Sequence, residues 1–241
     1  GITTLKENKI EEALQYFDKA RTIVNDSDIQ AETILCCTEL NYNLKNFDTA
    51  KELIKDFKAT FQNHKLSEKI DEIWFKIAVA DKNYDDLIEY FENIEEKNDS
   101  QKTVLQKTLL FKGNDLFYNK NYNAAVKMYE KSLDEGINFQ YNNQAYYGLG
   151  ECYFYLKNFD QALKEYLNVD ESSSKYPFAL LGMAYIQFNS QKYDLAQKNF
   201  QRILNLYKNK FDKNTIGEIK NRLGDCAFTK KQYQTALNLY K

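Results

Sequence analysis

A three-residue pattern recurs seven times along the 241-residue chain, at an interval of about 37 residues. Six of the seven copies have alanine at the centre and one has leucine, with an aromatic or aliphatic residue three positions before it and another four positions after it, as in Phe159, Ala162 and Tyr166. The intervals between successive centres are 37, 37, 38, 37, 34 and 40 residues. The seven centres are Ala13, Ala50, Leu87, Ala125, Ala162, Ala196 and Ala236. Such a period is typical of a repeat array, in which each unit buries its apolar face only by stacking on its neighbours.

The spacing within each copy predicts a helix, because residues three and four positions apart share one helical face. A second position, twelve residues before the centre, predicts another helix in each unit. It is occupied by Gly1, Gly113, Gly150, Ala184 and Gly224, with the larger Thr38 and Phe75 in two units. Because glycine inside a helix costs about 1 kcal/mol relative to alanine, we expect these small residues to let the backbone of the second helix approach closely. The chain has only 8 Gly and 1 Pro, too few for a fold with many tight turns.

The helix boundaries follow from these two patterns. We expect the first helix of each unit at about 1–6, 28–44, 66–81, 101–119, 140–156, 177–190 and 213–229. We expect the second helix at about 9–24, 47–62, 84–97, 122–135, 159–169, 193–208 and 233–241. Asparagines at 46, 83, 121 and 158 stand in the intervening turns, where asparagine tolerates the left-handed conformation that often ends a helix. Pro177 falls in a first helical turn, and the 40-residue interval predicts an extra turn near 206–211.

The clearest unit resembles the tetratricopeptide repeat. It reads Tyr146-x-x-Leu149-Gly150-x-x-Tyr153, followed by Ala162-x-x-x-Tyr166. The resemblance extends over essentially the whole chain. It implies an all-α fold, a right-handed α-α superhelix of antiparallel helix pairs, forming a single array over 1–241. We expect this array to be truncated at both ends, since Gly1 and Lys241 each fall inside an expected helix.

The resemblance also implies a concave groove lined by the first helices. The residues that would face this groove lie just after the glycine position, four to five positions further on, and one helical turn earlier. The candidate partner-binding residues are Asn114, Phe117, Tyr118, Tyr147, Glu151, Phe154, Tyr155, Leu181, Tyr185, Phe188 and Asn189. Aromatic residues with a polar group are common binding anchors. The alternative is that these rings pack between neighbouring repeats.

Catalytic and metal-binding patterns are largely missing from the sequence. The only histidine, His64, reads as a solvated turn residue, and the four cysteines do not have zinc-site spacing. We therefore expect no enzymatic activity, no cofactor and no metal. Net charge −2 argues against nucleic-acid binding, and no apolar run is long enough to insert into a membrane. Unpaired thiols favour the cytoplasm, with a periplasmic or envelope-associated location as the alternative.

Three functions fit these features. The first is a scaffold that binds a segment of a partner protein in the groove. The second is a spacer or assembly arm of a larger bacterial machine, which could belong to the cell envelope and self-associate through uncapped ends. The third is a recruiting domain of an enzyme whose catalytic part lies elsewhere. A basic clamp for the carboxylate terminus of a chaperone is disfavoured, because Leu110 stands where such repeats carry lysine and Glu151 opposes an anion.

Overall fold

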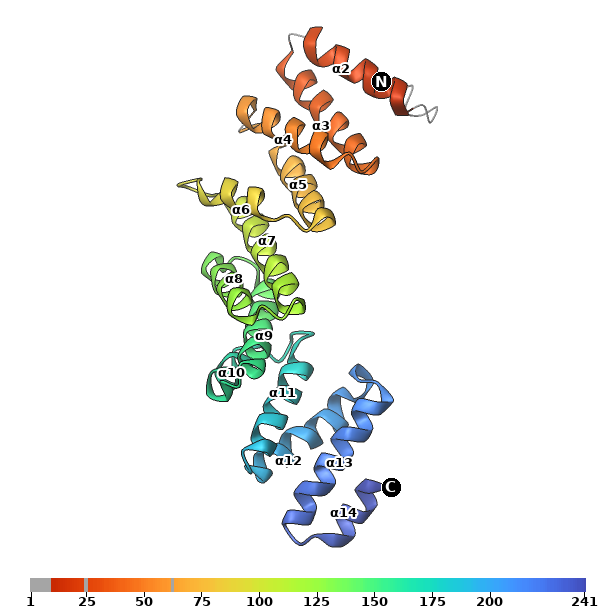
Figure 1. The fold of residues 1–241 in the computed structure, drawn as a ribbon, viewed down its shortest axis with the longest axis vertical. Coiled ribbons are helices and arrows are strands. Elements are labelled where there is room, and N and C mark those ends of the chain that lie inside the picture. The colour runs from red at the N-terminus through yellow and green to blue at the C-terminus, as the bar shows by residue number, and fades with distance from the viewer. Residues whose placement is uncertain (1–9, 24–25, 62) are drawn as a thin grey trace. The chain divides into compact units, whose positions relative to one another are not determined.

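The computed structural model describes residues 10–23, 26–61 and 63–241, and it is shown as a ribbon in Figure 1. Thirteen α-helices and no strand occur among these residues, which confirms the all-α class. The expected helix at 1–6, with Gly1, lies outside the described residues. The chain divides into two compact units, 1–111 and 112–241. The single array over 1–241 stays a prediction.

The first unit contains five helices and most of a sixth. They are α2 (Ile10–Ile23), α3 (Ser27–Asn43), α4 (Phe47–Thr60), α5 (Ser67–Asp81), α6 (Asp85–Glu92) and the greater part of α7 (Asp99–Tyr118). Helix α3 packs on α2, α4 and α5. The repeat centres Ala13, Ala50 and Leu87 are completely buried, as the periodicity predicts.

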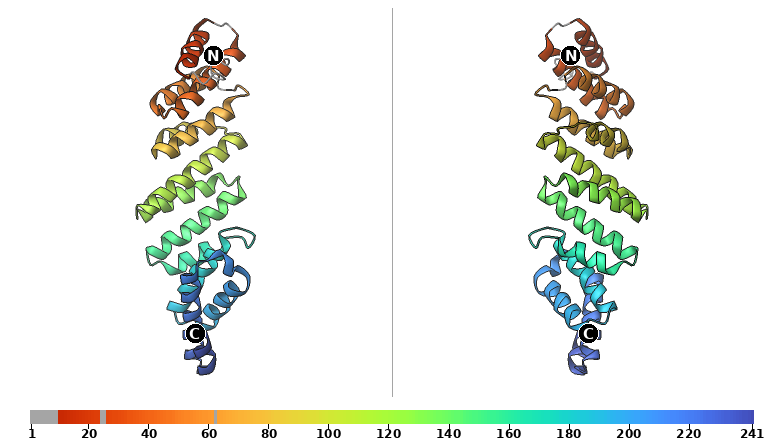
Figure 2. Two further views of the ribbon diagram at one scale, coloured as in Figure 1. Left: turned by 90° about the vertical axis from the view of Figure 1, so that its right-hand side faces the viewer. Right: turned by 90° about the vertical axis from the view of Figure 1, so that its left-hand side faces the viewer.

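The second unit begins with the end of α7 and continues through seven helices. They are α8 (Tyr122–Glu135), α9 (Phe139–Tyr155), α10 (Phe159–Leu167), α11 (Tyr176–Asn189), α12 (Tyr193–Arg202), α13 (Lys213–Thr229) and α14 (Tyr233–Tyr240). From α8 onward each helix packs on the next, and α11 also packs on α9 (Figure 2). The first helices α9 and α11 of two successive repeats therefore lie side by side.

The turn inside each repeat differs from the expectation in one respect. The left-handed residue is the one before the asparagine position, with φ between 56° and 62° at Lys45, Lys82, Lys120, Lys157, Gln191 and Lys231. At Lys45 and Asn46, the two amides donate to the carbonyls of Tyr42 and Asn41, which closes α3 with a Schellman motif. The same pair of bonds closes α7, α9, α11 and α13. Asparagine is thus the residue after the left-handed position, and its own φ is negative.

Two second helices end earlier than expected. Helix α6 stops at Glu92 instead of continuing to about 97. After α12 the chain forms a π-helical turn at Ile203–Tyr207 and a 3₁₀ turn at Lys208–Lys210. The longer interval before the last repeat is therefore absorbed by extra helical turns, although these are not α-helical.

Candidate functional site

Tyrosines that rest on glycines form the floor of the candidate site. The Tyr129 ring of α8 lies against Gly113 of α7 and Gly148 of α9: a Cβ added at these glycines would stand 2.8 and 2.5 Å from the ring. The Tyr129 hydroxyl donates to Oδ1 of Asn114 at 2.8 Å. The expectation that the glycines admit the backbone of the second helix is therefore wrong, because they make room for an aromatic ring.

The next repeat uses the same arrangement. The Tyr166 ring of α10 is completely buried between Gly150 of α9 and Gly182 of α11. Added Cβ atoms would approach this ring to 2.4 and 2.6 Å. The Tyr166 hydroxyl donates to Oε1 of Glu151 at 2.5 Å. One tyrosine thus joins the first helices of two successive repeats and orients the acceptor that follows the glycine.

The last two repeats show what is essential in this arrangement. Tyr240 lies over Gly224 and donates to Oδ1 of Asp225 at 2.8 Å. In the repeat before it the ring is Phe200, which has no hydroxyl and instead packs edge-on against Tyr185 at 5.5 Å between centroids. The hydrogen bond to the residue after the small position therefore forms only where the ring is a tyrosine.

Two adjoining pockets lie above this floor, with volumes of about 370 and 200 Å³. They share Tyr147 and Glu151 of α9 and Phe178 of α11. We call them together the aromatic groove. Its lining residues are Asn114, Phe117, Tyr118, Tyr129, Gln144, Tyr147, Gly148, Glu151, Phe154, Tyr155, Tyr166, Lys175, Phe178, Leu181, Gly182 and Tyr185.

Nine of the eleven candidate residues line the aromatic groove. They are Asn114, Phe117, Tyr118, Tyr147, Glu151, Phe154, Tyr155, Leu181 and Tyr185. The other two lie elsewhere: Phe188 is half-buried against Tyr193 with the Arg222 guanidinium over its ring, and Asn189 is exposed at the end of α11. The structure therefore gathers most of these residues on one surface, while their role in binding stays a prediction.

The candidate rings differ in their exposure. Tyr118 is 79% exposed and Tyr155 is 53% exposed, so both are accessible to a partner. Tyr155 stacks on Tyr122 at 5.1 Å with an interplanar angle of 10°. Phe154 and Tyr185 are half-buried and pack against the core of the second unit. Substitution of these last two rings would therefore disturb packing as well as the groove surface.

The electrostatic centre of the aromatic groove is Glu151. Burial raises the pKa of its carboxyl, while hydrogen bonding to Tyr166 and Tyr147 and the charge of Lys175 act in the opposite direction. Burial and the nearby Glu151 also raise the pKa of Tyr147 above its ordinary value. The groove therefore holds a poorly solvated carboxylate whose hydroxyl neighbours remain donors at neutral pH.

Sequence reasoning missed several groove residues that come from the beginning of α11 and the floor. Phe178 is three positions before Leu181, as Gln144 is before Tyr147, so the helical spacing could have indicated it. Lys175 precedes α11 and its Nζ lies 5.4 Å from the Tyr147 ring centroid. No sequence pattern indicated that contact.

Family models and solved structures relate this geometry to known proteins. Two models described as tetratricopeptide repeat match the chain, one over residues 112–176 and the other over residues 178–210. These ranges contain the groove and the tyrosine–glycine contacts beneath it. The chain contains tetratricopeptide repeats. Its thirteen described helices fit the predicted count of about seven repeats.

Three solved structures share the fold. The C-terminal part of a TPR repeat-containing protein from Cytophaga hutchinsonii is 17% identical, with a TM-score of 0.62, over 99% of this chain and 92% of that one. A signal-transduction ATPase with a tetratricopeptide repeat sensor, from Pyrococcus horikoshii, is 15% identical with a TM-score of 0.57, over 99% of this chain and 40% of that one. BtubC from P. vanneervenii is 14% identical with a TM-score of 0.53, over 97% and 87%. A search of curated protein sequences finds no match.

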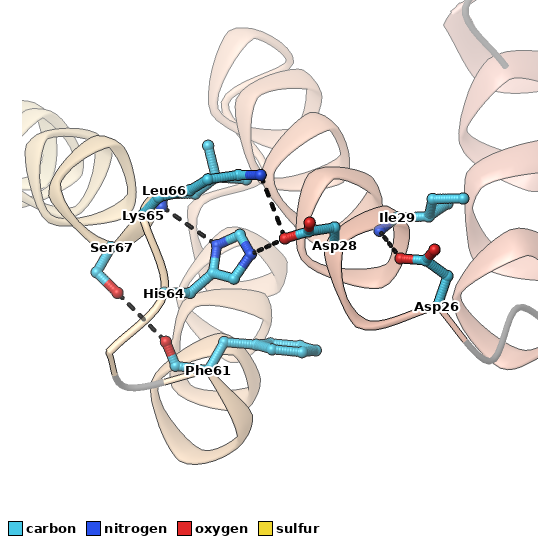
Figure 3. A network of polar contacts seen from close by, with 8 residues as sticks. All are labelled: Asp26, Asp28, Ile29, Phe61, His64, Lys65, Leu66 and Ser67. Carbon is cyan, nitrogen blue, oxygen red and sulfur yellow. Dashed lines mark hydrogen bonds and ion pairs between the residues drawn. The ribbon is translucent and has the colours of Figure 1, made fainter.

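The histidine of this repeat protein is not a solvated turn residue, which corrects the expectation. The His64 side chain is only 13% exposed, and its Nε2 lies 2.7 Å from Oδ1 of Asp28 (Figure 3). Its Nδ1 accepts from the Leu66 amide at 3.2 Å, so Nε2 carries the proton that is donated to Asp28. This bond, followed by Lys65, holds the pKa of Asp28 below its usual range. The arrangement anchors the turn before α5 to the beginning of α3.

Cys152 and Cys226 are poorly suited to nucleophilic chemistry. Burial raises the pKa of Cys152 to about 12 and that of Cys226 to about 11. A reactive cysteine requires the opposite shift. Among the described residues, no group of three or more His, Cys, Asp or Glu side chains is placed to hold a metal ion.

Two further pockets lie outside the aromatic groove. One of about 460 Å³ adjoins the loop between α10 and α11, where Arg202 donates to Glu171 at 2.8 Å and to the Tyr176 hydroxyl at 2.7 Å. The other, of about 290 Å³, is lined by residues of α2 and α3. No helix in the described parts of the chain is long and apolar enough to cross a membrane.

Proposed function

We propose that the aromatic groove of residues 112–241 binds an extended or helical segment of a partner protein. Tetratricopeptide-repeat proteins are generally non-catalytic scaffolds for protein interactions, and this chain contains such repeats. The observation that carries the proposal is the pair of adjoining pockets, rimmed by the exposed rings of Tyr118 and Tyr155. Large rings with a polar edge supply contact area at a small cost in side-chain entropy.

The floor favours the same function because it is held in place before binding. Tyr129 and Tyr166 are buried, and each is bonded to a residue that lines the groove. A preorganised surface loses little conformational freedom when a ligand binds. The groove therefore combines a fixed floor with accessible rings at its rim.

Selection of displayed random peptides on the immobilised 241-residue chain tests this proposal. Tyr155→Glu should abolish binding of the enriched peptides, because it places a charge at the rim without entering the core. Tyr233→Glu is the matched control, since Tyr233 is 58% exposed and lines neither pocket of the groove. Enriched peptides that bind equally to Tyr155→Glu and to the unmodified chain would disprove groove binding.

A further inference from the structure

Glu151 is held where the two pockets of the aromatic groove meet. It lines both of them, and its Oε1 accepts from the Tyr166 hydroxyl at 2.5 Å. Among the ion pairs of the described residues, none includes Glu151. Neutral hydroxyl donors orient a carboxylate but do not neutralise its charge. A partner that covered the groove would therefore desolvate this anion further.

The chain already places a cation beside this carboxylate. The Lys175 ammonium lies over the Tyr147 ring at 5.4 Å from its centroid, within the range of a cation–π contact. Lys175 lines the larger pocket with Glu151, and its charge acts on that carboxyl. Lys175 thus places a positive charge on the face of Tyr147, which lines both pockets.

The walls at the junction suit a cation as well. Tyr147 and Phe178 lie 6.3 Å apart between centroids, with their rings tilted by 59°. Aromatic faces attract cations through their quadrupole, and guanidinium groups also stack on them. A carboxylate that shares a pocket with aromatic faces is therefore complementary to the planar, positively charged end of arginine or to a lysine ammonium.

We propose that the aromatic groove selects a partner segment carrying an arginine or lysine side chain, which enters the junction, displaces Lys175 from the face of Tyr147 and pairs with Glu151. This inference rests on the proposed function, because it names the chemistry of the segment that the groove binds. An acidic segment would bring a second negative charge close to the Glu151 carboxylate, and the two charges would repel each other. A wholly apolar segment would bury Glu151 without a new counter-charge, which is costly.

The test uses the peptides selected on the whole chain, with acetylated and amidated ends so that terminal charges do not contribute. For one enriched peptide, versions with arginine, norleucine or glutamate at the selected basic position are compared by fluorescence anisotropy. The protein variants are Glu151→Gln, which keeps an acceptor for the Tyr166 hydroxyl, and Lys175→Gln. Their matched controls are Glu165→Gln and Lys164→Gln on α10, because neither position lines the groove.

The two charge changes should act in opposite directions. We expect Glu151→Gln to weaken the arginine peptide about tenfold and to leave the norleucine peptide unchanged, as close charge pairs do in double-mutant cycles. Lys175→Gln should strengthen the arginine peptide about threefold, because a competing cation is removed. The control variants should leave both affinities unchanged.

The other outcomes would contradict the inference, and they differ in whether they also contradict the proposed function. Peptides that require Tyr155 but carry no basic residue would overturn the cation preference and leave groove binding intact. The cation preference also fails, with groove binding intact, if Glu151→Gln weakens the arginine and norleucine peptides equally. If no peptide is enriched, or if binding does not depend on Tyr155, the proposed function and this inference both fail.

Discussion

Replacement of Gly150 by alanine tests the contact that builds the floor of the groove. The new Cβ would stand 2.4 Å from two atoms of the Tyr166 ring, about 1 Å inside ordinary van der Waals contact. The ring cannot retreat, because Gly182 leaves no more room on its other side: a Cβ there would come within 2.6 Å. A shifted ring would also strain the hydrogen bond from its hydroxyl to Glu151.

The expected magnitude follows from two opposing effects. Overpacking a filled core costs about 1–3 kcal/mol, and the trapped ring places Gly150→Ala at the upper end. Alanine returns about 1 kcal/mol of helix propensity. We therefore expect a net loss of about 2 kcal/mol in the free energy of unfolding. Urea unfolding followed by far-UV circular dichroism measures this loss as a lower midpoint.

Two other glycines provide the controls. Nothing lies within 4 Å of a Cβ added at Gly217, so Gly217→Ala should stabilise α13 by about 1 kcal/mol. At Gly224 the opposing ring is Tyr240, which is 45% exposed and can turn away, so alanine there should cost little. Equal midpoints for Gly150→Ala and Gly217→Ala would refute the assignment of Gly150 as a seat for the Tyr166 ring.

The remaining predictions concern charged side chains outside the groove. Lys58→Met should destabilise the first unit by about 3 kcal/mol, because it leaves the Asp71 carboxylate of a buried ion pair without its cation. Tryptophan fluorescence during urea unfolding measures this loss. Adding Asp71→Leu to the variant should recover most of it. Burial raises the pKa of Asp71, so the folded state holds that proton more tightly than the unfolded chain does. The deficit of the single variant should therefore grow as pH rises through the raised pKa and shrink on acidification, and a deficit independent of pH would contradict this. Arg202→Met should increase amide hydrogen exchange in the loop before α11, because it removes the hydrogen bonds to Glu171 and Tyr176. The midpoint of urea unfolding should hardly change. Unchanged exchange would show that these bonds do not hold the loop.

Local spacing was sufficient to predict most of the helices. Residues at three- and four-position intervals must share a helical face, and the anchors Ala125, Ala162 and Ala196 are indeed completely buried. The left-handed position was assigned to asparagine, although lysine or glutamine occupies it. Conformational propensity favoured asparagine at the left-handed position, but the paired hydrogen bonds of the Schellman motif determine which residue adopts that conformation.

The sequence placed in the groove those residues whose positions follow from the repeat pattern. Tyr118, Glu151 and Tyr155 follow from positions counted from the glycine slot, because every first helix presents the same face. Lys175 could not be assigned to the groove in this way. Its place depends on how the loop before α11 ends and on the packing of α11 against α9.

The sequence by itself determined the all-α repeat and the positions of its small residues, because both depend on intervals of a few residues along one helix. Only the tertiary structure decided what those small residues accommodate. Tyr166 is held by two glycines from different helices, Gly150 and Gly182, and its hydroxyl orients Glu151. A contact between residues of three helices depends on their relative positions in space, which no single helical period encodes.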